Sequence, residues 1–361
     1  MDPSPAQAPS WYVKPVDALR VALCIYIVIF HAHLQAFGAY RYATLSQGIA
    51  AVNIFFVISG YGLMSSFLRH GGFPGGLGVY FMRRAARLLP LYYACLVLSL
   101  LSVWFLSVPR AAADLTPLAL LGHVFLFQNF LHDDYSYAIN STYWFVAVEA
   151  QLYLAFPFFA FIWKSRGAVP AVLLGVCFFA VSWLLSGGGT LFARPQFILL
   201  LLFGMIAAAI VAKSRIRPMD ARLPGSLALV VIFLSCCAFL WAYLHRADDI
   251  GLPFVALVRD LSSGLGGAAA LVVLSVPGRD MLRRVLSHPA FGVMAPFAYA
   301  AYLSHDILLR YIHGIMTSQF GLSHGGLFVA MVAVAFPLVA AVSWLLHVLV
   351  ERPFLRAIRR S

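Results

Sequence analysis

The sequence predicts an all-α integral membrane protein of about ten transmembrane helices, and three observations lead to this prediction. Of the 361 residues, 62% are hydrophobic and only 11% are charged, whereas about a quarter of the residues in a soluble globular protein are charged. The mean hydropathy is +0.89. The apolar residues also form runs of roughly 20, the length that a helix needs to cross the hydrocarbon core of a bilayer. This composition excludes a water-soluble domain as the main body of the chain.

Ten apolar runs are long enough to cross the membrane. We expect transmembrane helices at residues 18–38, 48–68, 88–108, 144–163, 169–186, 196–212, 226–244, 253–275, 290–312 and 327–350. The run at 116–131 is different, because as a helix it would reach only about 24 Å, short of the ~30 Å core. We therefore expect this segment to re-enter the membrane or to lie at its outer interface.

The distribution of Lys and Arg favours ten spans with both termini in the cytoplasm. If 116–131 does not cross, nineteen of the 25 basic residues fall on one side. Basic residues collect in cytoplasmic loops, so this side is the cytoplasmic one. Four basic residues then lie outside and two lie within spans, namely Arg41, Arg110, Arg194 and Arg246, and Arg259 and Arg310. If 116–131 crossed, the basic loop at 213–222 would fall outside while the earlier basic loops stayed inside.

This topology explains the net charge of +12, so we expect no nucleic-acid partner. The five cysteines lie inside apolar runs and lack the spacing of metal ligands, and we expect small buried side chains and no metal site. One membrane-embedded domain is predicted at 17–354, between short cytoplasmic tails at 1–16 and 355–361. We expect no additional soluble domain.

The first predicted span carries polar residues on one helical face. Arg20 and His31 are eleven positions apart, close to three helical turns, and Asp17 lies on the same stripe. Ionisable side chains inside a bilayer are costly and are therefore candidates for function. A hydrogen-bonded contact between helices would explain His31 equally well. His33 points to nearly the opposite side, where a structural role is favoured.

Three arginines, Arg83, Arg84 and Arg87, lie at the expected cytoplasmic end of the third span. Guanidinium groups match the geometry of phosphate, so these residues are candidates for binding a phosphate-bearing ligand. A purely topogenic role would also account for them. In the second span, small residues that include Ser59 and Gly60 permit close contact between helices.

Other ionisable residues are expected in the outer half of the membrane. Glu149 lies about five residues into the fourth span, at a depth comparable to that of His31. His305 lies in the ninth span and Arg259 in the eighth, near the same level. For Glu149, a buried ion pair with Arg259 or Arg310 is the structural alternative.

Six short motifs follow one another in an order that resembles acyltransferase family 3, from Asp17 to Phe354. The motifs are Arg20-x10-His31, FFVISGY at 55–61, RRAARLLPLYY at 83–93, Trp144-x4-Glu149-x-Gln151-x-Tyr153, SHPAFGVMAPFAYAAYLSH at 287–305 and Glu351-Arg-Pro-Phe354. Two positions depart from the family. The family commonly has Asp before the FF pair of the second span, where this chain has Asn53, so no carboxylate is expected there. The doubled acid of the fourth span is here Glu149 followed by Ala150.

The resemblance implies transfer of an acyl group, usually acetyl, from acetyl-CoA or another cytoplasmic acyl-CoA to a hydroxyl. Typical acceptors are sugars of exopolysaccharide, O-antigen or peptidoglycan, or a small secreted glycoside or macrolide, and the expected location is the inner membrane of a bacterium. The arginine cluster at 83–87 would hold the phosphates of CoA. His31 would be the general base, because imidazole titrates near neutral pH. An acyl-histidine intermediate also remains open.

Glu149 would orient or charge-balance His31, or act as the acid–base partner itself. Supporting roles are expected for Arg20, Asp17, Trp144, Tyr153, Ser59, His305 and Arg259. A transporter or flippase of a polysaccharide precursor is the alternative function, since intramembrane charges and glycine-interrupted spans suit one. A transporter does not account for the arginine cluster and the Arg20–His31 pairing together.

Overall fold

The computed structural model describes residues 14–38, 45, 47–106, 115–131, 133–185, 194–216, 222–245, 252–275, 286 and 288–360. Over these residues the chain is helical and contains no strand. The long helices are α1 (Lys14–Phe37), α2 (Gly48–His70), α3 (Gly76–Leu106), α6 (Trp144–Arg166), α7 (Ala168–Leu185), α8 (Gln196–Ile216), α9 (Arg222–Leu244), α10 (Leu252–Ser275), α13 (Ala298–Phe320) and α14 (His324–Leu346). The short ones are α4 (Pro117–Phe125), η2 (Gln128–Phe130), α5 (Asp133–Tyr137), α12 (Pro289–Met294), η4 (Ala295–Phe297), the π-helical turn η5 (His347–Glu351) and α15 (Arg352–Arg360).

Nine helices of the described part of the chain are long and apolar enough to cross a membrane, and the chain is a polytopic α-helical membrane protein. The predicted span that is not among these nine is the ninth, 290–312; it corresponds to α13, which begins eight residues later than predicted. The residues just before α13 form the short helices α12 and η4, which contain Pro289 and Pro296 in their first turns. Proline suits the first turn of a helix and not its interior, so α13 does not extend back over these residues. The 23 residues of α13 would extend about 35 Å. Polar residues such as Asp306 lower its hydropathy, yet it packs along α1 and α14.

The third helix also begins earlier than hydropathy predicts. We expected a span from residue 88, whereas α3 starts at Gly76. The arginines at 83–87 therefore lie within the helix rather than ahead of it. The error arises because a run of apolar residues marks only the part of a helix that faces hydrocarbon, and not its charged cytoplasmic turns.

The short apolar run at 116–131 does not form a spanning helix, as predicted. Its helix α4 has only nine residues, or about 14 Å. The segment is folded into the protein against α3 and the start of α6. The Tyr92 hydroxyl donates to the His123 carbonyl at 2.9 Å, and the Gln128 amide donates to the Tyr143 carbonyl at 3.1 Å.

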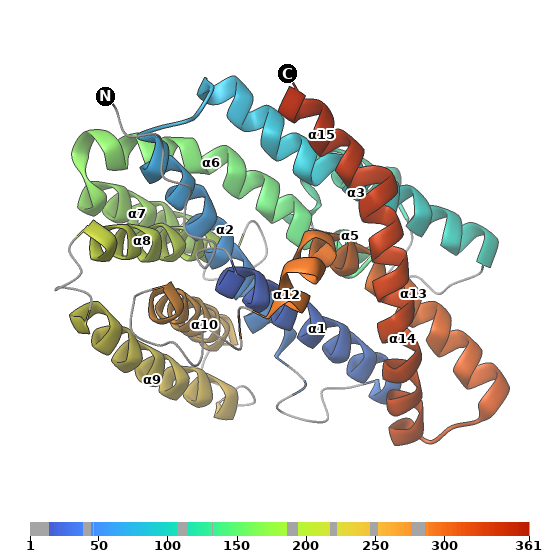
Figure 1. Cartoon of the computed structure of the whole chain (residues 1–361). Helices are drawn as coiled ribbons and strands as arrows, with labels where there is room; N and C mark the ends of the chain where they lie inside the picture. The colour runs from blue at the N-terminus through green and yellow to red at the C-terminus, as the bar shows by residue number, and fades with distance from the viewer. Residues whose placement is uncertain are drawn as a thin grey trace.

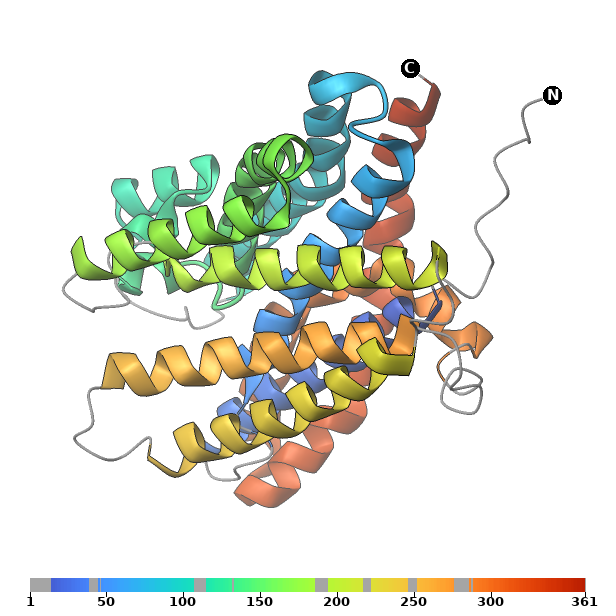
Figure 2. The same cartoon turned by 90° about the vertical axis from the view of Figure 1, so that its left-hand side faces the viewer.

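Figure 1 shows α7 to α10 gathered on the left and α13 and α14 on the right, with α1 between them. In Figure 2, α8, α9 and α10 run side by side. The helix pair with the most extensive contact is α2 with α8, where Gly60 faces the Leu201 carbonyl and Gly204 faces the Val57 carbonyl. A Cβ atom at either glycine would collide with the facing backbone, which confirms close packing at Gly60.

The packing forms two hydrophobic clusters. The larger one joins side chains of α2, α3, α6, α8 and α10 and also includes residues of α1 and α13, such as Ile27 and Tyr302. The smaller one is made of α1, α13 and α14, with Val28, Leu309 and Met331 among its buried members. The smaller cluster matters for the site because it packs α1 against α13. These two helices lie near opposite ends of the sequence, and both contribute residues to the site.

Candidate active site

A cavity of about 290 Å³ lies where α1, α2, α3, α6 and α13 meet. These helices come from distant parts of the sequence, so only the folded chain assembles the cavity. Its polar lining residues are Arg20, Ser59, Arg84, Arg87, Glu149 and Tyr153. Aromatic side chains close much of the remaining wall, namely Phe55, Phe145, Tyr299 and Tyr302.

The cavity lies toward the end of the bundle that the charge pattern assigns to the cytoplasm. Arg20 is six residues after the start of α1, and Arg84 is eight residues after the start of α3. At 1.5 Å per residue these positions are about 9 and 12 Å from the helix ends. Asp17 is one turn away from Arg20 and pairs with it, at 3.4 Å between Oδ1 and Nη1.

Glu149 projects into this cavity from α6. The Ser59 hydroxyl donates to Glu149 Oε1 at 2.6 Å. The second carboxylate oxygen, Oε2, is buried and has no hydrogen-bond partner within the described residues. The guanidinium groups of Arg20 and Arg87 lie close enough to act electrostatically on this carboxylate. Ser59 thus holds one carboxylate oxygen, and Tyr153 and the two arginines also interact with the carboxylate.

The alternative ion pairs of Glu149 are wrong. Arg259 pairs with Asp260 at 2.9 Å, and Arg310 pairs with Asp306 at 2.9 Å, one turn along the same helix. Each arginine finds a carboxylate close by in its own helix, so neither is left to reach α6.

The three arginines of α3 have different surroundings. Arg84 lines the cavity, and its guanidinium lies 5.7 Å from the ring centre of Tyr153 and 5.9 Å from that of Tyr80. Its Nε is buried and has no hydrogen-bond partner in the described part of the chain. Arg87 lines the same cavity, whereas Arg83 lines a smaller cleft of about 60 Å³ that Arg84 also borders. Arg84 therefore stands where the two hollows meet.

His31 lies in a different group, between α1 and α13. Its Nδ1 is 3.1 Å from the Ile27 carbonyl and 3.1 Å from Nε2 of His305. His33 packs instead against Phe37 and Phe328, as expected for the opposite face. The sequence therefore predicted correctly that His31 and His33 have different neighbours.

The structure does not join His31 to Glu149, although both were expected at one depth. Among the described residues, no hydrogen bond or ion pair links them. The reason is that α6 begins inside the protein, since Thr142 and Tyr143 just before it are fully buried. Glu149 is level with Ser59, which lies about 16 Å from the outer end of α2.

An aromatic layer separates the cavity from the histidines. Phe145 and Tyr302 both line the cavity and lie 4.8 Å apart between ring centres, with Phe55 beside them. On its other side, the Tyr302 ring centre is 5.8 Å from that of His305. Tyr302 therefore belongs to the cavity lining and also contacts His305.

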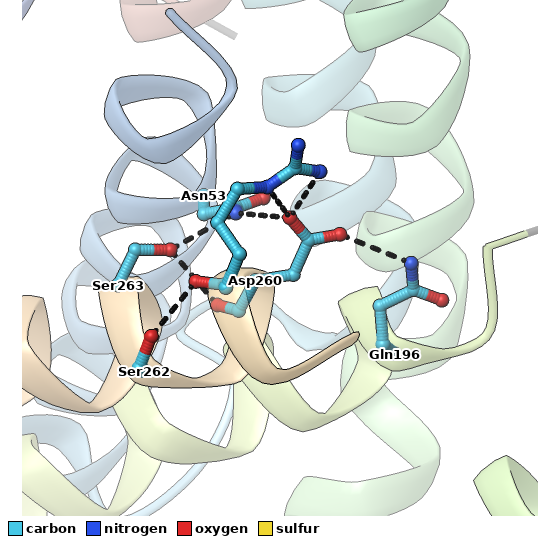
Figure 3. Close-up of polar contacts among 6 residues, drawn as sticks. Asn53, Gln196, Asp260, Ser262 and Ser263 are labelled. Atoms are coloured by element: carbon cyan, nitrogen blue, oxygen red, sulfur yellow. Dashed lines mark hydrogen bonds and ion pairs between the residues drawn. The ribbon is translucent and has the colours of Figure 1, made fainter. Parts of the chain in front are cut away.

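A third polar group surrounds Asn53, which, as expected, brings no carboxylate of its own to this position of α2. Asp260 of α10 supplies one: Asn53 Nδ2 donates to its Oδ1 at 3.1 Å, and Gln196 Nε2 donates to its Oδ2 at 3.2 Å. Figure 3 shows Asp260 held between these two amides, with Ser263 below Asn53. Arg259 completes the group at 2.9 Å. The carboxylate comes from a neighbouring helix rather than from α2.

The remaining supporting residue, Trp144, lies apart from the cavity lining. Its indole stacks on Phe197, and the Arg194 guanidinium lies 5.2 Å from its ring centre. We infer that Trp144 fixes the outer end of α6. Arg259, likewise, belongs to the Asp260 group and does not line the cavity.

Among the residues that the structure describes, no three His, Cys, Asp or Glu side chains are arranged to hold a metal ion. The cysteines are only partly as expected. Cys24 and Cys95 are buried, but Cys177, Cys236 and Cys237 are exposed on the outside of the bundle. An apolar span predicts lipid contact as readily as burial, so composition could not separate these two groups.

Sequence reasoning missed the aromatic wall and the carboxylate at Asp260. Tyr299 and Tyr302 lie in the motif at 287–305 but were not singled out, because aromatic residues are common in apolar helices. The Asp306–Arg310 pair was detectable, since opposite charges four residues apart on a helix are neighbours.

Comparison with known proteins identifies a family and two relatives. The family model described as an acyltransferase domain matches residues 14–348. The chain is 24% identical over 322 residues to the peptidoglycan O-acetyltransferase OatA of Listeria monocytogenes, covering 81% of this chain and 49% of that protein, so it spans about half the length of OatA. It is also 24% identical over 361 residues to the acyltransferase MdmB of Streptomyces mycarofaciens, covering 92% of this chain and 87% of that protein. No solved structure matches.

Proposed function

Since this chain belongs to the acyltransferase family whose model spans residues 14–348, we propose that it is a membrane O-acyltransferase. It transfers an acyl group, most simply acetyl, from cytoplasmic acyl-CoA to a hydroxyl of a cell-surface or exported carbohydrate. The observation that carries this proposal is the cavity toward the cytoplasmic end, which brings Arg84 and Arg87 together with Glu149.

The arginines suit the donor. Coenzyme A carries several phosphates, and guanidinium groups bind phosphate through charge-assisted and often bidentate hydrogen bonds. The buried and unpartnered Nε of Arg84 is a donor that a bound anion would satisfy. Arg83, in the adjoining cleft, is placed to contact the outer part of the same molecule. The narrow pantetheine arm would then extend into the 290 Å³ cavity.

The transfer needs one proton to move. The acceptor oxygen attacks the thioester carbonyl carbon, its proton passes to His31, the C–S bond breaks, and the CoA thiolate takes up a proton. Arg20 and Arg87 supply positive charge in the donor cavity, where negative charge develops on the thioester oxygen. Because Glu149 contacts Ser59 and not His31, we assign its carboxylate to the donor side, where it orients Ser59 and balances the two arginines.

The acceptor class rests on the relatives. The name of OatA states that it acetylates peptidoglycan, which is a carbohydrate polymer outside the cell membrane. Both relatives come from bacteria, which supports the proposal that this protein lies in the cytoplasmic (inner) membrane of a bacterium. A carbohydrate hydroxyl reaching His31 from the outer side would meet a thioester that enters from the inner side.

The experiment is acyl transfer by purified protein, measured as CoA release in the presence and absence of a carbohydrate acceptor. Arg84→Ala and Arg87→Ala should each raise the donor KM by roughly 10- to 150-fold, because one charge-assisted contact is worth about 1.5–3 kcal/mol. Arg83→Ala should have a smaller effect of the same sign. The control is Arg166→Ala, which removes an exposed charge from the end of α6, outside the cavity.

An unchanged donor KM in all three α3 variants would show that the arginines serve topology alone. Wild-type protein that neither transfers nor hydrolyses acyl-CoA, but moves a glycolipid across vesicles, would support the transporter instead.

A further inference from the structure

Two ionisable side chains next to His31 have no role in the chemistry described above. His305 is fully buried and Asp306 is 1% exposed, both on α13. His305 faces His31 on α1, with 3.1 Å between the ring nitrogens and 4.9 Å between ring centres. Burying such groups is costly unless their hydrogen bonds are satisfied, so their arrangement is informative.

The carbonyl contacts of the two rings determine where each proton lies. His305 Nδ1 is 3.1 Å from the Ala301 carbonyl, which can only accept a hydrogen bond, so Nδ1 carries the proton. In the neutral ring, His305 Nε2 is then an acceptor. His31 Nδ1 faces two acceptors, namely this Nε2 and the Ile27 carbonyl, so it also carries a proton. The neutral form of His31 therefore has its lone pair on Nε2.

We propose that His305 is a positioning residue that holds His31 as the Nδ1–H tautomer, with Nε2 free to accept the proton of the acceptor hydroxyl. This inference rests on the proposed function, in which His31 is the base. His305 itself does not meet substrate, because it is fully buried and both of its ring nitrogens are engaged. In the described part of the chain, the hydrogen bonds of His31 involve Nδ1 alone.

Asp306 completes the arrangement. Its carboxylate pairs with Arg310 at 2.9 Å, accepts from the Ser141 backbone amide at 3.4 Å, and acts electrostatically on His31. When His31 takes the proton it becomes a cation, which the buried negative charge of Asp306 stabilises and the positive charge of Arg310 opposes in part. The proton remains on His31 until the leaving thiolate is protonated, so His305 and Asp306 stay in their original protonation states throughout.

The first test is nitrogen NMR of the full-length protein labelled with ¹⁵N at its 11 histidines. The signals of His31 and His305 are assigned by their loss in His31→Ala and His305→Leu. We expect a protonated Nδ1 and an unprotonated Nε2 for both rings at neutral pH, with a correlation across the hydrogen bond from His31 Nδ1 to His305 Nε2. A His31 ring with its proton on Nε2 would overturn the proposal, whether or not the protein transfers acyl groups.

The second test separates positioning from folding by kinetics. His305→Leu removes the acceptor and should lower kcat about tenfold, as expected for one lost hydrogen bond, with the donor KM unchanged. His305→Gln offers an amide oxygen near the position of Nε2 and should restore most of kcat. His313→Leu, two turns further along α13, is the control and should resemble wild type. Equal loss in the Gln and Leu variants, or a rise in donor KM with either, would contradict a positioning role.

Discussion

Replacing Asp260 with alanine would leave three donors without their acceptor. Asn53 and Gln196 reach its two carboxylate oxygens at 3.1 and 3.2 Å, and Arg259 at 2.9 Å. These bonds tie α10 to α2 and α8 in the part of the molecule where those helices pack closely. The hydrogen bonds of Asp260 therefore connect α10 with α2 and α8.

The expected loss of stability can be worked from this geometry. Each side-chain hydrogen bond between helices of a membrane protein contributes about 0.6–1.7 kcal/mol to the free energy of unfolding. The Arg259 side chain is 32% exposed, so its ion pair is screened and adds about 0–1 kcal/mol. The sum of two such hydrogen bonds and the ion pair predicts that Asp260→Ala lowers the free energy of unfolding by about 1–4 kcal/mol.

A charge exchange makes the test sharper. Asn53→Asp alone would place two carboxylates in contact, and Asp260→Asn alone would leave Arg259 without its partner. The double variant Asn53→Asp with Asp260→Asn restores one carboxylate and one amide, with their positions exchanged. We expect each single variant to be destabilised and the double variant to recover at least half of the combined loss.

Reversible unfolding of the detergent-solubilised protein in a denaturing detergent, followed by circular dichroism, measures these differences. The reasoning would be refuted by a double variant whose loss equals the sum of the single losses. Such additivity would mean that the two side chains do not share the hydrogen bond.

The remaining predictions concern the base, helix packing and topology. His31→Ala should lose roughly 10²–10⁴-fold in transfer rate while still binding acyl-CoA, and His33→Ala should keep most activity; an active His31→Ala measured in membranes at matched expression would reject His31 as the base. Gly204→Ala should lower the unfolding midpoint because its Cβ meets the Val57 carbonyl, whereas Gly314→Ala, which meets nothing within 4 Å, should be neutral or stabilising. An unchanged midpoint for Gly204→Ala would show that α2 and α8 are not in backbone contact. Reporter fusions after residues 135 and 167 should lie outside and inside the cytoplasm, respectively, and the reverse at both sites would invert the topology.

The sequence was sufficient for the membrane fold and for most of its helices, because a bilayer imposes one strong constraint on length and polarity. The same constraint predicted that 116–131 does not cross. Hydropathy did not predict the helix boundaries correctly where a helix has polar turns at its end. This is the case for α3 and α13. Those errors moved helix boundaries without changing the order of the spans.

The sequence identified most residues of the candidate site but not how they contact one another. Helical periodicity placed His31 and His33 on different faces, because that property is local to one helix. The separation of Glu149 from His31 is not local: it depends on the buried start of α6, which no count along the chain reveals. Asp260 was hidden for the same reason, since its partner Asn53 lies 207 residues earlier.

The division of the core into two clusters has a consequence for motion. Helices α1 and α13 bury residues in both clusters, and they line the cavity together with α2, α3 and α6. His31 and His305 both belong to the helices of the smaller cluster. If α1, α13 and α14 moved as a unit against the other helices, the cavity would change shape because α1 and α13 line it, and the two imidazoles would move together.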